Sequence, residues 1–499
     1  MKKIDVLLVH PSNRVDTYQR LGSEFASVEP PVWAGMLATF LHKKGLEVRI
    51  LDTNAEGLGY ADAADIVKQI SPVLVAVVCY GQQPSASTLV MPGAGQLAIN
   101  IKEIMPEQPI LFIGGHVAAL PERTLQEEAC DFVCDGEGPY TLHELVLALK
   151  SRSPDFSKVR GLLYRLDGKI FRNASAPLVM DLDNEMPGVA WDLLPVEKYV
   201  AHNWHCFGRL DSRNSYASMY TSLGCPFSCD FCCIHAPFKH GQDVLGLKNK
   251  SAYRLFSPTS VLDQLDILVN KYGITNIKFA DELFVYNTTH VKNICEQIVS
   301  KGYDLNIWAY VRVDTWTHEM LELMRKAGIR WLAPGIESGS QRVRADMHKN
   351  FKQDNAVMAI EAFRQHEIHT IGNFLVGLPE DDLCTMRETL DFAKELNCEF
   401  FNFYCAMAYP GSKLYQRAIG ENLSLPATWN GYSQHAYDTL PLPTKYISGQ
   451  EVLKFRDAGW LEYFTNPTYL QMIEQKFGAS TKEHIERMTS YTLPRKYVS

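Results

Sequence analysis

Two stretches of the chain alternate short apolar runs with segments of helical spacing. In residues 1–150 the apolar runs fall at 5–9, 47–51, 74–78, 110–113 and 131–134. Continuous apolar runs of this length are typical of strands that are buried on both faces of a parallel sheet. The pattern therefore predicts an α/β unit with helices on both faces, and ligands of such sheets bind at the carboxyl ends of the strands.

Residues 206–420 repeat the alternation six times. A strand pattern at 216–222 enters a cysteine-rich loop, and further strands, each after a helical segment, are expected at 276–280, 306–310, 331–336, 370–376 and 400–404. Six successive strand and helix units predict a second parallel sheet that presents its functional groups at the carboxyl ends of its strands.

The remaining segments are expected to connect or cover these two units. Residues 151–205 contain a hairpin pattern with an Asp167-Gly168 turn, followed by proline-rich sequence without a period, and predict a connector. Residues 421–499 have helical spacings, which predict helices packed on the second unit or, as the alternative, a lid over the substrate.

Composition places the chain among ordinary globular proteins. Of its 499 residues, 46% are hydrophobic and 21% are charged, and this length predicts two to three domains. No apolar run approaches the ~20 residues that a membrane helix requires, so we expect a cytoplasmic protein with reduced thiols. The net charge of −8 and the absence of a lysine- or arginine-rich block argue against nucleic acid as the main partner.

Three cysteines stand close together in the sequence Cys225-Pro-Phe-Ser-Cys229-Asp-Phe-Cys232. This spacing allows the three sulfurs to face one point, one ligand short of the four that a [4Fe–4S] cluster usually takes. The fourth iron would then be open to a ligand from outside the protein. Structural zinc is the alternative, with His235 as its fourth ligand. The adjacent Cys233 is expected to pack rather than to bind metal.

The cysteine spacing, the strand before it and the aromatic Phe231 before the third cysteine resemble the radical S-adenosylmethionine (SAM) superfamily. The resemblance implies a partial (β/α)6 barrel of the TIM type over residues 206–420. It also implies that Cys225, Cys229 and Cys232 hold a [4Fe–4S] cluster with SAM on the open iron. Electron transfer would then cleave SAM to a 5′-deoxyadenosyl radical.

The same resemblance assigns contacts with SAM to residues near the ends of the expected strands. Asp281 and Glu282 stand where the superfamily has a Gly-Gly-Glu-like motif that contacts the amino group of SAM, although an acid here could instead cap the next helix. Arg312 could reach the carboxylate of SAM or form an ion pair with Glu337. The full set of implied contacts is Phe231, Asp281, Glu282, Arg312, Glu337, Ser338, Phe374 and Val376.

Three loops of the first unit, at 80–87, 114–116 and 135–138, contain glycines that let backbone approach a bulky ligand closely. Their order resembles the Rossmann-like, doubly wound cobalamin-binding domain of cobalamin-dependent radical SAM enzymes. The implied cobalamin contacts are Tyr80, Gly81, Ser85, Gly114, Gly115, Gly136, Glu137 and Gly138.

No histidine is expected beneath the cobalt, because the Asp-x-His-x-x-Gly motif is absent. His10 and His116 are expected to be loop or core residues. The missing motif also leaves open a domain that has lost cobalamin. The glycines fail the GxGxxG spacing of dinucleotide sites, so a nicotinamide cofactor has weak support.

The resemblance as a whole implies a cobalamin-dependent methyltransferase that acts on an unactivated carbon of a small molecule. Its cofactors would be a [4Fe–4S] cluster, SAM and cobalamin, and flavodoxin or ferredoxin would be its electron donor. An oxidative cyclase, like the anaerobic protoporphyrin-ester cyclase, or another radical rearrangement would use the same parts. A methylthiotransferase is disfavoured because Cys79, Cys130 and Cys134 are too irregular for a second cluster. A cobalamin-binding sensor or carrier with an inert barrel is the alternative from another class.

Overall fold

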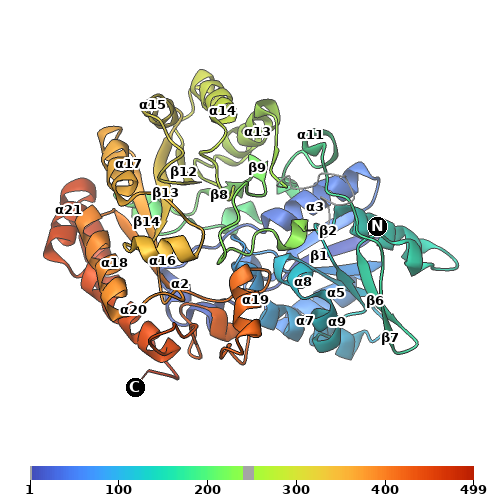
Figure 1. Ribbon diagram of the computed structural model, residues 1–499. Coiled ribbons are helices and arrows are strands. Elements are labelled where there is room, and N and C mark those ends of the chain that lie inside the picture. The colour runs from blue at the N-terminus through green and yellow to red at the C-terminus, as the bar shows by residue number, and fades with distance from the viewer. Residues whose placement is uncertain (1–2, 240–251, 499) are drawn as a thin grey trace.

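The computed structural model describes residues 3–239 and 252–498, and it arranges them as two halves, each built on a sheet (Figure 1). The first half contains the first apolar series of the sequence and the second half contains the cysteine loop. Among the residues that the structure describes, no helix has both the length and the apolar character needed to span a bilayer.

Seven strands form the first sheet, in the order β2-β1-β3-β4-β5-β6-β7. Strands β1 to β5 run parallel, which confirms the prediction from the apolar runs. The bounds are β1 Val6–His10, β2 Val48–Asp52, β3 Leu74–Val78, β4 Ile110–Ile113, β5 Phe132–Cys134, β6 Leu162–Leu166 and β7 Lys169–Arg172. The strand order reverses between β1 and β3, and such a reversal is where open α/β sheets bind their ligands.

Helices cover both faces of the first sheet. Leu8 of β1 packs in the same apolar cluster as α3 and α10, whereas its neighbour Leu7 packs with α5 and α7. Alternate strand residues therefore face opposite helical layers, as expected for a sheet buried on both sides. The helices of this half are α1 Arg14–Tyr18, α2 Leu21–Glu24, α3 Val32–Lys43, α4 Thr53–Glu56, α5 Tyr60–Ile70, α6 Ala86–Leu89, α7 Met91–Ile104, α8 Gly115–Ala119, α9 Pro121–Glu127, α10 Pro139–Lys150 and α11 Leu182–Glu185.

The hairpin expected in the connector is present, with Asp167 and Gly168 at positive φ in its turn. Its strand β6 pairs antiparallel with β5, so the hairpin extends the first sheet. The chain then passes to the second half through short 3-10 turns at Trp191–Leu193, Val196–Lys198, Trp204–Cys206 and Leu210–Ser212.

Six strands form the second sheet, all parallel and in chain order. Their bounds are β8 Tyr216–Met219, β11 Asn276–Phe279, β12 Asn306–Val311, β13 Ile329–Glu337, β14 His369–Val376 and β15 Phe400–Cys405. The prediction of one strand over 216–222 was wrong, because the chain leaves this sheet after Met219. Ser222–Leu223 forms the separate strand β9, which pairs antiparallel with β10 at Arg254–Leu255. The physical reason is Asp281, which holds Thr221 and Ser222 across the end of β11.

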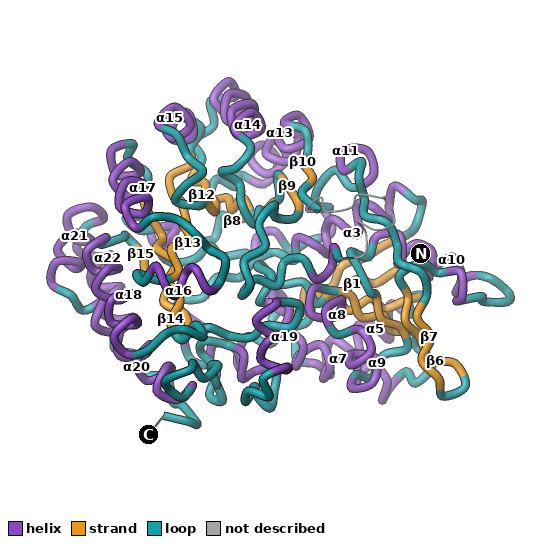
Figure 2. Tube along the Cα trace, viewed as in Figure 1, coloured by secondary structure: helices purple, strands orange, loops and turns teal. Residues whose placement is uncertain are grey.

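The helices of the second half lie around the outside of its strands, except α19, which lies near the middle of the molecule beside α8 (Figures 1 and 2). They are α13 Pro258–Asp266, α14 Thr288–Lys301, α15 His318–Lys326, α16 Gln341–Asp346, α17 Gln353–Gln365, α18 Leu383–Leu396 and α19 Lys413–Gly420. The helices predicted after residue 421 are α20 Gly449–Phe464, α21 Pro467–Phe477 and α22 Ala479–Thr489. They pack on the second sheet: the Tyr463 hydroxyl donates to the Cys398 carbonyl at 2.7 Å, and the Phe477 ring stacks on Trp331.

Candidate functional site

The cysteine loop follows β9, and its three cysteines have partly exposed side chains. Burial raises the pKa of Cys225 to about 11, with smaller contributions from Glu282 and Cys229. Burial also raises the pKa of Cys232, and Cys225 and Cys229 add to that effect. The three thiols are therefore close enough to act on one another electrostatically. This proximity fits the three thiolate ligands of an iron–sulfur cluster.

The other metal-binding side chains of the loop have different surroundings. His235 Nε2 lies 2.7 Å from the carbonyl oxygen of Phe227, so this histidine closes the loop instead of offering a fourth zinc ligand. Cys233 is buried, as a packing role requires. Within residues 3–239 and 252–498, no three His, Cys, Asp or Glu side chains are arranged to hold a metal ion. The convergence of the three sulfurs on one point thus stays a prediction.

Two adjacent acids follow β11, and their surroundings differ. Asp281 is fully buried and accepts hydrogen bonds from the Thr221 amide at 3.0 Å and from the hydroxyls of Thr221 and Ser222. Both oxygens of its carboxylate are therefore hydrogen-bonded to the start of the cysteine loop. Burial raises the pKa of Glu282 to about 8, and its Oε2 is buried without a hydrogen-bond partner. Of the two acids, only Glu282 has an oxygen left for a ligand.

Arg312 follows β12 and lies beside the cysteine loop. Its guanidinium donates to both carboxylate oxygens of Asp314, at 2.9 and 3.0 Å, and lies 4.1 Å from the ring centroid of Phe227. The ion pair with Glu337 that the sequence suggested is not formed. The reason is local: Asp314 is two residues away on the same turn, and Glu337 has another partner.

That partner is Lys349, which contacts Glu337 Oε1. Glu337 ends β13 at a register shift and has a φ of 65°, so its backbone is in the left-handed region that non-glycine residues avoid. The Lys349 ammonium lies 5.9 Å from the ring of Phe231, and it acts on the pKa of Cys225 in the lowering direction. The pair therefore places a nearly buried cation beside the cysteine loop.

Three further residues of the implied SAM contacts point their side chains into the protein. Ser338 Oγ lies 3.0 Å from Thr389 Oγ1, and the side chains of Phe374 and Val376 lie in the apolar core. The Val376 carbonyl accepts a hydrogen bond from the Ala406 amide at 2.8 Å. A ligand contact by these strand ends would have to use other backbone atoms.

Three glycines of the implied cobalamin loops are explained by the packing of the loops themselves. A Cβ at Gly81 would lie 2.3 Å from the Ala86 side chain, and one at Gly114 would lie 2.4 Å from the Cys79 carbonyl oxygen. Gly138 has a φ of 111°, and its Cβ would overlap Ile113. Gly115 and Gly136 have more room, with nearest contacts at 3.4 and 3.9 Å. The space next to the Cα atoms of Gly115 and Gly136 is therefore not filled by the surrounding protein.

The polar residues of the same loops make contacts within the protein. Glu137 pairs with Arg254 at 2.7 Å and accepts from the Val179 amide at 2.9 Å, so a buried ion pair joins the two halves. The Tyr80 hydroxyl donates to the Glu137 carbonyl at 3.1 Å, and the Tyr80 ring stacks on Trp33 at 4.3 Å. Ser85 precedes α6 and is partly exposed.

Two pockets lie where the halves meet. The smaller, of about 360 Å³, is lined by Tyr80, Gly81 and Gly115 of the first half and by Cys233 and Glu282 of the second. It therefore brings two of the glycine loops, the cysteine loop and the Glu282 carboxylate to one place.

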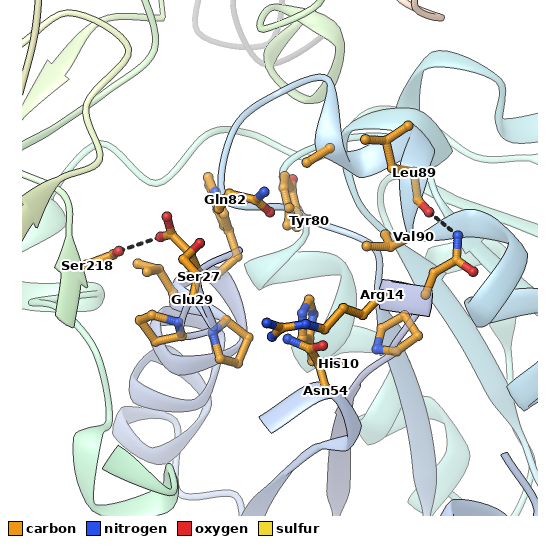
Figure 3. Close-up of a pocket in the computed structure, with 18 of the residues that line it drawn as sticks. His10, Arg14, Ser27, Glu29, Asn54, Tyr80, Gln82, Leu89, Val90 and Ser218 are labelled. Carbon is orange, nitrogen blue, oxygen red and sulfur yellow. Dashed lines mark hydrogen bonds between the residues drawn. The ribbon is translucent and has the colours of Figure 1, made fainter. Parts of the chain in front are cut away.

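The larger pocket, of about 830 Å³, lies at the reversal of strand order in the first sheet (Figure 3). His10 at the end of β1 and residues 80–82 after β3 line it, and Ser218 and Ala280 of the second half complete its wall. Its position is the one where open α/β sheets bind ligands.

The two histidines at strand ends differ from each other. His116 is 3% exposed, its Nδ1 lies 3.1 Å from Thr88 Oγ1, and burial lowers its pKa to about 3, as expected for a core histidine. His10 lines the larger pocket, and its Nδ1 is buried without a partner.

The sequence did not reveal four residues that shape the site: Arg14, Trp33, Arg254 and Lys349. The partners of Lys349 and Arg254 are 12 and 117 residues away in the chain, so no short motif contains either pair. A lone arginine or tryptophan gives no signal of its own. Of these contacts, the Arg254–Glu137 pair exists only once the two halves are in place.

Comparison with protein families matches both halves of the chain. The family model described as the radical SAM superfamily matches residues 219–393, and that described as the B12 binding domain matches residues 19–146.

The chain is also similar to individual proteins over nearly its whole length. It is 29% identical to an uncharacterized methyltransferase of Pyrococcus horikoshii, over 94% of each chain. It is 24% identical to the anaerobic magnesium-protoporphyrin IX monomethyl ester cyclase of Rubrivivax gelatinosus, over 93% of this chain and 78% of that protein.

Among solved structures, the fold is similar to that of the radical SAM methyltransferase TsrM from Kitasatospora setae, with cobalamin and a [4Fe–4S] cluster bound. The TM-score is 0.69 at 16% identity, over 98% of this chain and 99% of that one. The two matched domains and the cysteine loop lead to one conclusion: the chain is a radical SAM enzyme in which a B12 binding domain precedes the radical SAM domain.

Proposed function

We propose that this enzyme is a cobalamin-dependent methyltransferase that adds a methyl group to an unactivated carbon of a small molecule. The observation that carries the proposal is the smaller pocket, where the glycine loops of the B12 binding domain face Glu282 and the cysteine loop. The similarity to proteins named methyltransferases supports it.

We interpret the first sheet as Rossmann-like and doubly wound, and the second as an open partial (β/α)6 barrel. Its six parallel strands in chain order support the second interpretation. We propose four parts: a cobalamin-binding domain over 1–150, a connector with the hairpin over 151–205, the barrel over 206–420 and a helical region over 421–499.

The residues present fit the three cofactors. We propose that Cys225, Cys229 and Cys232 hold the cluster and that Glu282 accepts hydrogen bonds from the amino group of SAM, since it is the acid with an unpartnered buried oxygen. Lys349 offers a cation beside the same loop. Tyr80, Gly81 and Gly115 would face the corrin, with the backbone of the other glycine loops shaping its seat.

Bound in these places, the cofactors supply an electron for cleavage of SAM and a methyl group for transfer. The chain's own part is to orient and to exclude water. The buried Arg254–Glu137 pair fixes the cysteine loop region against the glycine loops. Asp281 accepts a hydrogen bond from the Thr221 amide and so fixes the start of the cysteine loop. Correct placement of reacting groups can supply several kcal/mol of the barrier reduction, on the order of ~7–11 kcal/mol in well-oriented cases.

We also propose a cytoplasmic enzyme that is reduced by flavodoxin or ferredoxin, because a reducing compartment preserves thiolate ligands. The test of the function is anaerobic reconstitution with iron, sulfide and cobalamin, followed by incubation with SAM and candidate substrates. A product that gains the mass of one CH2 group supports methylation. Bound corrin with no cleavage of SAM would favour a carrier.

An anaerobic cyclase is the second candidate, favoured by the similarity to the Rubrivivax gelatinosus cyclase over most of both chains. It predicts a product that has lost hydrogen and gained no carbon. Product mass therefore separates the two reactions.

A further inference from the structure

We infer that the larger pocket contains a subsite for an anionic group, a carboxylate or a phosphate, of the small-molecule substrate, with Arg14 as its cation. That this ligand is the substrate rests on the proposed function. The anion-binding character rests only on the residues of the pocket.

Arg14 carries a positive charge that the protein does not neutralise. Its Nε donates to the Gly22 carbonyl at 2.7 Å, and one terminal nitrogen reaches the carbonyls of Gly22 and Ala26. In the described part of the chain, no carboxylate lies within ion-pair distance of it. The carbonyls hold the side chain in place but leave its charge for a ligand. Figure 3 shows the Arg14 side chain extended across the pocket, next to His10 and Asn54 in this view.

Two buried polar atoms of residues that line the same pocket have no partner. His10 is 8% exposed and Asn13 is 7% exposed, and both line the pocket. His10 Nδ1 and Asn13 Oδ1 make no hydrogen bond. A buried polar atom without a partner costs about 1–3 kcal/mol, so both atoms favour a polar ligand in this pocket. A carboxylic or phosphoric group offers acceptors to His10, and a protonated or hydroxyl part of the ligand offers a donor to Asn13.

Glu29 is the one acidic side chain among the lining residues, and it does not cancel Arg14. It accepts from the Ser218 hydroxyl at 2.7 Å and lies 3.5 Å from the Lys278 ammonium. Lys278 is itself buried, donates to the Gln82 carbonyl at 2.8 Å, and supplies the countercharge for Glu29. The charge left over in the pocket is that of Arg14, and one anionic group balances it.

The other lining residues of the pocket indicate the chemistry of the rest of the ligand. Tyr18, Trp33, Tyr80 and Tyr220 line the pocket, and the Trp33 and Tyr80 rings are stacked on each other. The structure thus points to an acidic small molecule with an aromatic or other apolar body.

The test uses the full chain, reconstituted with cluster and cobalamin, and titrates it calorimetrically with benzoate and with phenyl phosphate. At least one probe should bind, and the tighter of the two identifies the acid as carboxylate or phosphate. Arg14→Met should weaken that binding at least about tenfold, because it removes a charged hydrogen bond. Arg14→Lys should restore most of it. Arg49→Met, at an exposed position on β2, is the matched control and should bind like the wild type.

Two results would overturn the inference: no binding of either probe to the wild type, or unchanged binding to Arg14→Met. Loss of corrin absorption in Arg14→Met with no change in probe binding would also overturn it, because Arg14 would then serve the corrin. If Arg14→Met does not fold, His10→Gln takes its place, and equal binding to that variant contradicts the inference. Iron and corrin content are read separately, so failure of the proposed function is seen independently.

Discussion

The carboxyl ends of the two sheets face each other, but charged side chains dominate one end and glycine backbone dominates the other. At the end of the second sheet, charged side chains are arranged around the cysteine loop: Arg312 with Asp314, Lys349 with Glu337, and the unpartnered Glu282. At the end of the first sheet, glycines pack against their own loops and leave backbone facing the pockets.

This difference indicates how each sheet end would bind its cofactor. A small, charged ligand such as SAM is held by a few charges placed around it, whereas a large, mostly neutral ring needs a shaped surface that backbone provides. The side-chain end should therefore be sensitive to charge, and the backbone end to added bulk.

Replacement of any one of Cys225, Cys229 and Cys232 by alanine should abolish cleavage of SAM, because two thiolates do not hold the cluster with one iron open. Cys233→Ala is the matched control, since its buried thiol is a packing group, and it should keep cluster and activity. Iron content and 5′-deoxyadenosine formation are the measurements. A triad variant with normal cleavage would contradict the assignment.

Arg254→Met should destabilise the protein by about 3–5 kcal/mol, because it leaves the buried Glu137 carboxylate without its charge partner. Arg330→Met breaks an ion pair whose acid, Asp304, is 84% exposed, and it should cost less than about 1 kcal/mol. Urea unfolding of both variants measures the contrast. Equal costs would mean that the pair between the halves contributes no more than a surface pair.

Gly138→Ala should cost about 2 kcal/mol and weaken corrin binding, because φ of 111° strains any other residue and the new Cβ meets Ile113. Gly45→Ala has similar backbone strain, at φ of 80°, but nothing lies near its Cβ. The control should therefore lose about 1 kcal/mol and keep corrin binding. If the two variants bound corrin equally well, a side chain added at Gly138 would not affect corrin binding.

At pH 8.5, Glu282→Gln should weaken SAM binding about tenfold, since it removes a charge opposite the SAM ammonium. Burial raises the pKa of Glu282 to about 8, so its carboxyl is mostly protonated at pH 7 and becomes charged as pH rises through that value. SAM affinity of the wild type should thus increase between pH 7 and pH 8.5, and this increase should be absent in the glutamine variant. Asp281→Asn, which alters the neighbouring acid, should retain an increase but at lower pH, because the Asp281 charge helps to raise the pKa of Glu282.

The sequence predicted the periodic parts of this molecule and missed the contacts between them. The apolar runs located all five parallel strands of the first sheet and the six strands of the second, because strand burial leaves a local pattern. The cysteine spacing is likewise a local pattern, and its assignment to a cluster stays a prediction. The break at Thr221 was missed, because it depends on Asp281, which is 60 residues further along the chain.

For the site residues too, local patterns were predictable from the sequence and contacts between distant residues were not. The sequence could narrow the SAM amino contact to Asp281 or Glu282, but only burial and hydrogen bonding separate the two. It offered Glu337 as a partner of Arg312, whereas Lys349 takes that place through a turn with no recognisable motif. His10 and Arg14 are only four residues apart, but residues 80–82 after β3 and Ser218 and Ala280 of the second half complete their pocket, and no local pattern predicts that.

We propose that one chain holds both cofactors, each at the carboxyl end of one sheet. The most direct measurement is the iron and corrin content of the anaerobically reconstituted protein, together with 5′-deoxyadenosine formation from SAM. We expect about four iron atoms and one corrin per chain, with cleavage that disappears in Cys229→Ala while corrin remains bound. Loss of corrin together with iron in that variant, or cleavage without iron, would contradict it.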